Sequence, residues 1–133
     1  MNKTLLIAGS IVAYVGLGML AFPFEFFEFN SVVTFTYSVD KASEFRGVGA
    51  FILLCGLFIT SCSLLNKRLN NAYLLSLAIY SSFSMSRITS FLIDGIPNKT
   101  ISLILGVELF ILVSCLISFS KYRKKQNYLI IFN

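Results

Sequence analysis

The sequence predicts an all-α integral membrane protein, a bundle of four transmembrane helices with a long aromatic loop after the first helix. Of its 133 residues, 56% are hydrophobic and only 13% are charged, and the mean hydropathy is +0.82. A soluble domain of this length has too little interior to bury so much apolar surface. Lipid must therefore face most of these side chains, and we expect the protein in the cell (cytoplasmic) membrane.

Four apolar segments cover residues 4–23, 47–65, 72–93 and 101–120. Each is close to the ~20 residues that a helix needs to cross the hydrocarbon of a bilayer. The first segment is longer than the apolar part of a typical signal peptide, and no small-x-small cleavage site follows it. We therefore interpret it as a retained helix, and residues 1–133 as a single transmembrane domain.

The first connection, residues 24–43, is rich in phenylalanine, with Glu25 and Glu28 interspersed. Aromatic side chains at this density beside a membrane end predict an interfacial segment, which either anchors the first helix or lies over the bundle as a lid. Residues 31–39 are rich in β-branched side chains, which favour a short extended stretch.

The distribution of Lys and Arg predicts the orientation. With four spans, the termini and the turn at 66–71 share one side of the membrane, and seven basic residues lie there: Lys3, Lys67, Arg68, Lys121, Arg123, Lys124 and Lys125. Three lie on the opposite side: Lys41, Arg46 and Lys99. The positive-inside rule places both termini, including the basic tail 121–133, in the cytoplasm. Much of the net charge of +5 comes from basic residues in the tail, which flanks the membrane on its cytoplasmic side. We therefore expect no nucleic-acid partner.

The sequence offers few groups for catalysis or metal binding. It has no His, and Cys55, Cys62 and Cys115 lie inside apolar segments with no C-x-x-C pair. Such cysteines usually serve as small hydrophobic residues. No nucleophile, metal site or phosphate loop is recognisable, so we expect no cofactor and favour a non-enzymatic role.

Two charged residues lie inside predicted helices. Arg87 is about 9 Å from the outer end of the third helix, and Glu108 is about 10 Å from the outer end of the fourth, at 1.5 Å per residue. Ionisable groups are costly in a bilayer and normally find partners inside the bundle. Because these two helices are sequential and antiparallel, the shared depth predicts an ion pair between Arg87 and Glu108.

Three further charged residues extend this pair into an outer polar cluster. Glu44 and Arg46 lie at the mouth of the second helix, and Asp94 lies two turns beyond Arg87. The cluster either locks the helices in register or forms a pocket in which the two arginines hold an anionic or carbonyl-bearing group. In the second case Glu108 or Glu44 would carry any proton transfer.

Small residues form strips on the first two predicted helices, at Gly9, Ala13 and Gly16 and at Gly49 and Gly56. Small residues at this spacing let helix backbones approach closely. If the strips face lipid, they would pack against a second copy of the chain or another membrane protein.

Several motifs resemble the bacterial family catalogued as domain of unknown function 4345. They are Glu44-Phe45-Arg46-Gly47, Ser86-Arg87-Ile88, Asp94-Gly95 and Glu108. The resemblance covers nearly the whole chain, and the family is distantly similar to the DoxX-like four-helix membrane proteins. It implies a compact four-helix bundle in a bacterial cytoplasmic membrane, and it implies no activity.

Three functions follow as hypotheses. The leading one is a module that binds a small amphipathic or anionic ligand, such as a lipid or quinone headgroup, in the outer cluster. The second is a structural or accessory subunit of a membrane complex. The third is a membrane enzyme with Glu108 as acid or base. A holin-like pore is disfavoured by the fixed charges and the long outer loop.

Overall fold

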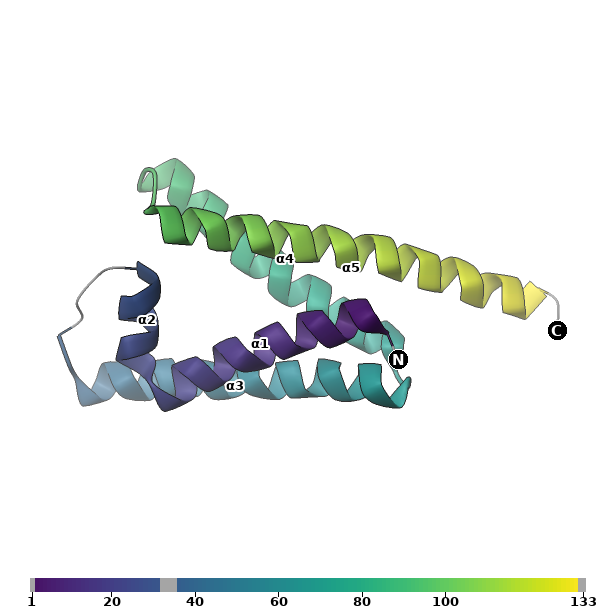
Figure 1. The fold of residues 1–133 in the computed structure, drawn as a ribbon, viewed down its shortest axis with the longest axis horizontal. Coiled ribbons are helices and arrows are strands. Elements are labelled where there is room, and N and C mark those ends of the chain that lie inside the picture. Colours follow the sequence, from purple (N-terminus) through teal and green to yellow (C-terminus); the bar gives the residue numbers. More distant parts are fainter. Residues whose placement is uncertain (1, 32–35, 132–133) are drawn as a thin grey trace.

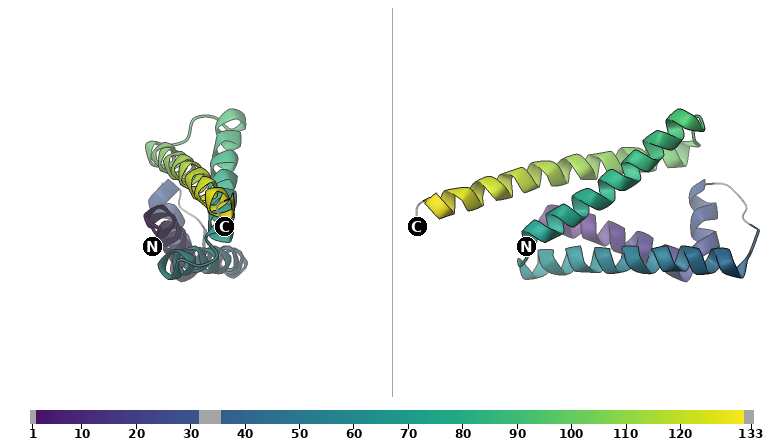
Figure 2. Two further views of the ribbon diagram at one scale, coloured as in Figure 1. Left: turned by 90° about the vertical axis from the view of Figure 1, so that its right-hand side faces the viewer. Right: turned by 180° about the vertical axis from the view of Figure 1, so that it is seen from behind.

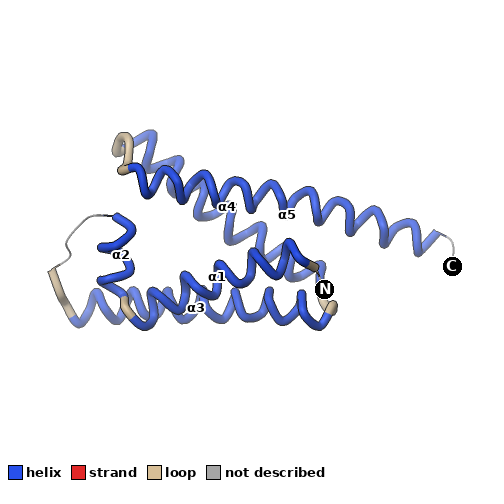
Figure 3. The backbone as a smooth tube through the Cα atoms, in the orientation of Figure 1, coloured by secondary structure: helices blue, strands red, loops and turns tan. Residues whose placement is uncertain are grey.

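The computed structural model describes residues 2–31 and 36–131, and within these ranges the chain forms five α-helices and no strand. The helices are α1 (Lys3–Ala21), α2 (Pro23–Ser31), α3 (Val39–Leu65), α4 (Leu69–Ile93) and α5 (Lys99–Ile131). Figure 1 shows their arrangement, and Figure 3 shows the short turns between α3, α4 and α5. The all-α prediction is confirmed.

Part of the predicted aromatic loop is helical. Pro23 cannot continue α1 because it has no backbone N–H, but it fits the first turn of α2, where that group needs no helical partner. The chain therefore bends at Phe22 and begins a fifth helix, which the sequence analysis missed. Of the predicted extended stretch at 31–39, residues 32–35 lie outside the described residues, and the prediction is wrong at its two ends, because Ser31 belongs to α2 and Val39 begins α3.

Three of the long helices extend beyond the predicted spans, whereas α1 ends at Ala21 instead of residue 23. α3 begins at Val39 instead of residue 47, α4 begins at Leu69 instead of residue 72, and the basic segment after residue 120 continues α5 to Ile131. The reason is that hydropathy marks the edge of the hydrocarbon, whereas a helix continues until a cap or a turn ends it. α3, for example, ends where Asn66 adopts a left-handed conformation with φ of 53°.

Three helices of the described chain, α1, α3 and α5, are long and apolar enough to cross a membrane. α4 has 25 residues, but its serines and Arg87 make it more polar. Large apolar side chains are widely exposed, among them Leu92 (80%), Leu103 (72%) and Phe110 (72%). Because water would disfavour such a surface and lipid would not, the chain is a multi-pass membrane protein.

α1 and α3 form a tightly packed pair. A Cβ atom at Gly16 would lie 2.6 Å from Leu53 Cα, and one at Gly56 would lie 2.6 Å from Ala13 Cα. Only glycine permits such a close approach of the two backbones. Both glycine strips are thus occupied within the chain, and the expectation that they face lipid is wrong.

α4 and α5 form a second pair, and the right-hand view of Figure 2 shows α4 rising away from α3 to meet α5 above α1 and α3. In Figure 1, α4 starts beside the end of α3 and diverges from it, while α2 rises from the end of α1 toward α5. Apolar side chains from α1, α3, α4 and α5 form the central core, and they include Val12, Ile52, Tyr80 and Ile111.

A polar network joins the four long helices near the turn at 66–68. The Asn2 side-chain amide donates to the Tyr73 hydroxyl at 2.5 Å, and this hydroxyl lies 2.6 Å from Ser118 Oγ. Ser63 Oγ donates to the Asn2 carbonyl at 2.7 Å. Tyr73 is fully buried, so these bonds satisfy its hydroxyl where water cannot.

Candidate functional site

The predicted ion pair is present and joins α4 to α5. Arg87 Nε donates to Glu108 Oε2 at 2.9 Å and to Oε1 at 3.1 Å. The Arg87 side chain is 27% exposed and that of Glu108 is 13% exposed. The prediction from equal depth on two antiparallel helices is therefore confirmed.

The pair uses only one edge of the guanidinium group. A single N–H is shared between both carboxylate oxygens, whereas the usual arginine–carboxylate fork uses two parallel N–H donors. Among the described residues, no hydrogen-bond acceptor is in place for the Arg87 Nη groups. Those donors remain able to bind a further acceptor.

A pocket of about 200 Å³ lies beside Arg87, where α4 turns into α5. Its walls combine serine hydroxyls, the guanidinium and apolar side chains: Ser86, Arg87, Ser90, Phe91, Gly95, Pro97 and Ile101. Gly95 has φ of 101°, which strongly favours glycine, and Asn98 caps the start of α5 by accepting from the Ile101 N–H at 2.8 Å.

Asp94 is connected to this pocket through Ser90. Ser90 Oγ donates to Asp94 Oδ2 at 2.6 Å within the last turn of α4, so the carboxylate orients one of the lining hydroxyls. Asp94 itself is exposed and does not line the pocket.

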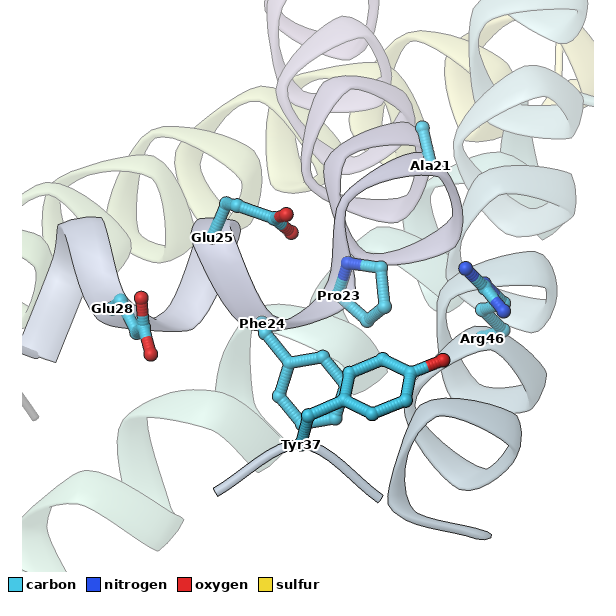
Figure 4. A pocket seen from close by; sticks show the side chains of 7 residues that line it. All are labelled: Ala21, Pro23, Phe24, Glu25, Glu28, Tyr37 and Arg46. Atoms are coloured by element: carbon cyan, nitrogen blue, oxygen red, sulfur yellow. The ribbon is translucent and has the colours of Figure 1, made fainter. Parts of the chain in front are cut away.

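Glu44 and Arg46 lie elsewhere. Both are exposed near the start of α3, and Arg46 lines a second pocket of about 270 Å³ at the bend between α1 and α2 (Figure 4). The lining residues are Ala21, Pro23, Phe24, Glu25, Glu28, Tyr37 and Arg46. The two pockets share no lining residue. The structure thus brings together Arg87 with Glu108 and Ser90 with Asp94, and it sets Arg46 among other residues.

The sequence analysis did not assign Glu25 and Glu28 to a site. Their spacing of three residues was the available signal, because it places both on one face of a helix. That signal required α2 to be recognised as a helix. The rings near this pocket make aromatic contacts, with centroids 5.2 Å apart for Phe24 and Tyr37 and 6.0 Å apart for Phe24 and Phe45.

The described residues contain no group of three His, Cys, Asp or Glu side chains placed to hold a metal ion. Cys55, Cys62 and Cys115 are free thiols, and the last two are buried in the two core clusters. Their surroundings are those of small apolar residues.

Comparison with known proteins gives one family. No curated protein and no solved structure matches the chain. The family model described as Domain of unknown function (DUF4345) matches residues 1–119, which include all five helices except the end of α5. The chain therefore belongs to this family.

Proposed function

We propose that α4 is a fourth membrane span and that both termini face the cytoplasm. α4 connects α3 and α5, which are both long and apolar enough to cross. At 25 residues, α4 is about 37 Å long at 1.5 Å per residue, against a hydrocarbon core of about 30 Å. The basic residues near 66–68 and after residue 120 then lie on one side, as the positive-inside rule requires.

Cysteine labelling tests this topology. In a chain with its three native cysteines replaced by serine or alanine, we expect a membrane-impermeant thiol reagent to label Ile96→Cys in intact cells. Lys67→Cys should react only after permeabilisation, because four spans put residues 67 and 96 on opposite sides. Labelling of both positions in intact cells, or of neither, would contradict a spanning α4.

We propose that the protein binds a small amphipathic ligand at Arg87. The observation that carries the proposal is the one-sided ion pair, which leaves the Arg87 Nη donors beside a pocket. Because Glu108 balances the arginine charge, a carbonyl oxygen suits these donors as well as an anion does. The Ser86 and Ser90 hydroxyls can bind the same headgroup, such as that of a quinone or lipid, and Phe91 and Ile101 can contact its apolar part.

Native mass spectrometry of the detergent-purified protein tests the ligand. We expect the wild type to carry a small molecule, and we expect Arg87→Gln to bind it roughly 10-fold more weakly or worse, because a charge-assisted hydrogen bond of about 1.5–3 kcal/mol is lost. The bound fraction should fall accordingly. Arg123→Gln is the control, since it removes an arginine from the exposed end of α5.

A second variant separates binding from folding. Arg87→Met combined with Glu108→Leu removes the donors without leaving an unpaired charge in the helices. Retention of the ligand by this variant would overturn the proposal, as would its loss from the Arg123→Gln control. A wild type that carries no small molecule would favour the role of accessory subunit.

One observation favours that second function. α5 is less buried than α1 or α3, and a Cβ atom at Gly106, in the first third of α5, would have no atom of another helix within 4 Å. Large apolar side chains beside it, Leu103 and Phe110, are each 72% exposed. This face would serve for packing against a membrane partner, and crosslinking through Gly106→Cys would detect one.

A further inference from the structure

The pocket at the bend between α1 and α2 carries both signs of charge. Glu25 and Glu28 come from α2, and Arg46 comes from α3. In Figure 4 the guanidinium lies to one side of the Phe24 and Tyr37 rings and the two carboxylates lie to the other. The charges are therefore separated across the pocket, with aromatic surface between them.

Arg46 and Glu25 do not neutralise each other. Among the described residues, no ion pair within 4 Å involves either side chain, and no hydrogen bond is made by either. Two opposite charges that line one pocket without pairing form a local dipole. A ligand that carries both charges can complement them at once.

The position of the pocket selects the class of ligand. Ala21 and Pro23 place it where the membrane helix α1 ends, and the Phe24, Tyr37 and Phe45 rings give it the aromatic character of a membrane interface. Its volume of about 270 Å³ is slightly below the ~300–1,000 Å³ of pockets that enclose whole drug-sized ligands. It suits a headgroup whose apolar tail remains in the bilayer.

We propose that this pocket binds the zwitterionic headgroup of an ammonium phospholipid. Arg46 binds the phosphate by charge-assisted hydrogen bonds, and Glu25 and Glu28 accept from the ammonium group beside the Phe24 and Tyr37 rings. The acyl chains lie along the exposed apolar surface of the helices. The two carboxylates would repel a purely anionic headgroup, and Arg46 would repel a simple cation, so both kinds of ligand are disfavoured.

This site is independent of the pocket at Arg87, and a lipid competition tests it. The detergent-purified protein receives equimolar phosphatidylethanolamine and phosphatidylglycerol with identical acyl chains, and native mass spectrometry counts the retained lipids. We expect the wild type to retain phosphatidylethanolamine about 10-fold over phosphatidylglycerol, which corresponds to one charge-assisted interaction of about 1.4 kcal/mol. Arg46→Gln should lose most of this retention.

Removing the carboxylates should reverse the preference. Glu25→Gln combined with Glu28→Gln leaves Arg46 as the charged group of the pocket, so phosphatidylglycerol should now exceed phosphatidylethanolamine. The matched controls are Lys41→Gln and Asp40→Asn, which remove the same charges from exposed positions on α3 outside the pocket. Both should keep the wild-type preference, and so should the variant that combines Arg87→Met with Glu108→Leu.

Three results would overturn the proposal. They are an equal or greater retention of phosphatidylglycerol by the wild type, a change of preference in the Lys41 or Asp40 controls as large as in the pocket variants, and binding of soluble phosphoethanolamine without binding of phosphatidylethanolamine. Loss of the preference in the Arg87/Glu108 variant would also count against a separate site. A failure of ligand binding at Arg87 alone leaves this prediction unaffected.

Discussion

Replacing Glu108 with leucine is expected to destabilise the protein by about 2–3 kcal/mol, more than replacing Arg87 with leucine. The Glu108 variant leaves a guanidinium in an apolar helix pair without its counter-ion. Inserting such a charge into a membrane costs about 2.5–3.5 kcal/mol at a helix centre. Because the Arg87 side chain is 27% exposed, we expect a destabilisation somewhat below this cost. Arg87→Leu leaves a carboxyl group, which can take up a proton and become neutral, whereas arginine cannot lose one.

The double variant, Arg87→Leu with Glu108→Leu, shows whether the pair is coupled. We expect its free energy of unfolding to be close to that of the wild type, because apolar replacements of a buried ion pair are often neutral or stabilising. Unfolding of the four proteins in detergent, followed by circular dichroism, gives the coupling energy. Additive losses from the two single variants would show that the ion pair contributes nothing, and Lys124→Leu controls for an added leucine at an exposed site.

The ion pair could be predicted from the sequence because few arrangements are compatible with it. A short turn between antiparallel helices places Arg87 and Glu108 at the same depth in the membrane. In apolar surroundings an unpaired charge is costly, which favours an ion pair between them. No comparable constraint applies to Glu44 and Arg46. They lie near the start of α3, where solvent or headgroups can satisfy a charge, and the neighbours of Arg46 depended on the unrecognised helix α2.

A strong sequence signal likewise separates the helices that were predicted from the one that was missed. Apolar runs located the long helices correctly, but α2 has nine residues and starts with Pro23, which in the sequence indicates a helix end as readily as a beginning. The glycine strips predicted close packing, which is confirmed. They could not show that α1 and α3 pack against each other, because spacing identifies a face and not its neighbour.

The close packing of α1 against α3 predicts that alanine has opposite effects on stability at two glycines, Gly56 on α3 and Gly106 on α5. Gly56→Ala is expected to destabilise the protein by about 1–3 kcal/mol, the usual range for overpacking. Its new methyl group would lie 2.6 Å from Ala13 Cα and 2.8 Å from Ala13 Cβ. Because these atoms belong to a backbone and its first side-chain carbon, no change of rotamer can relieve the contact. α1 and α3 would have to separate.

Gly106→Ala is the matched control, and its effect should have the other sign. It is also a helical glycine, but no atom of another helix lies within 4 Å of the added carbon. Alanine should therefore stabilise the protein by up to about 1 kcal/mol through helix propensity alone. A thiol-reactive dye measures both effects on heating, because Cys62 and Cys115 are buried and become reactive when the helices separate. Equal melting temperatures for the two variants would contradict backbone contact at Gly56, since propensity favours alanine at both positions and only close packing can reverse it at one.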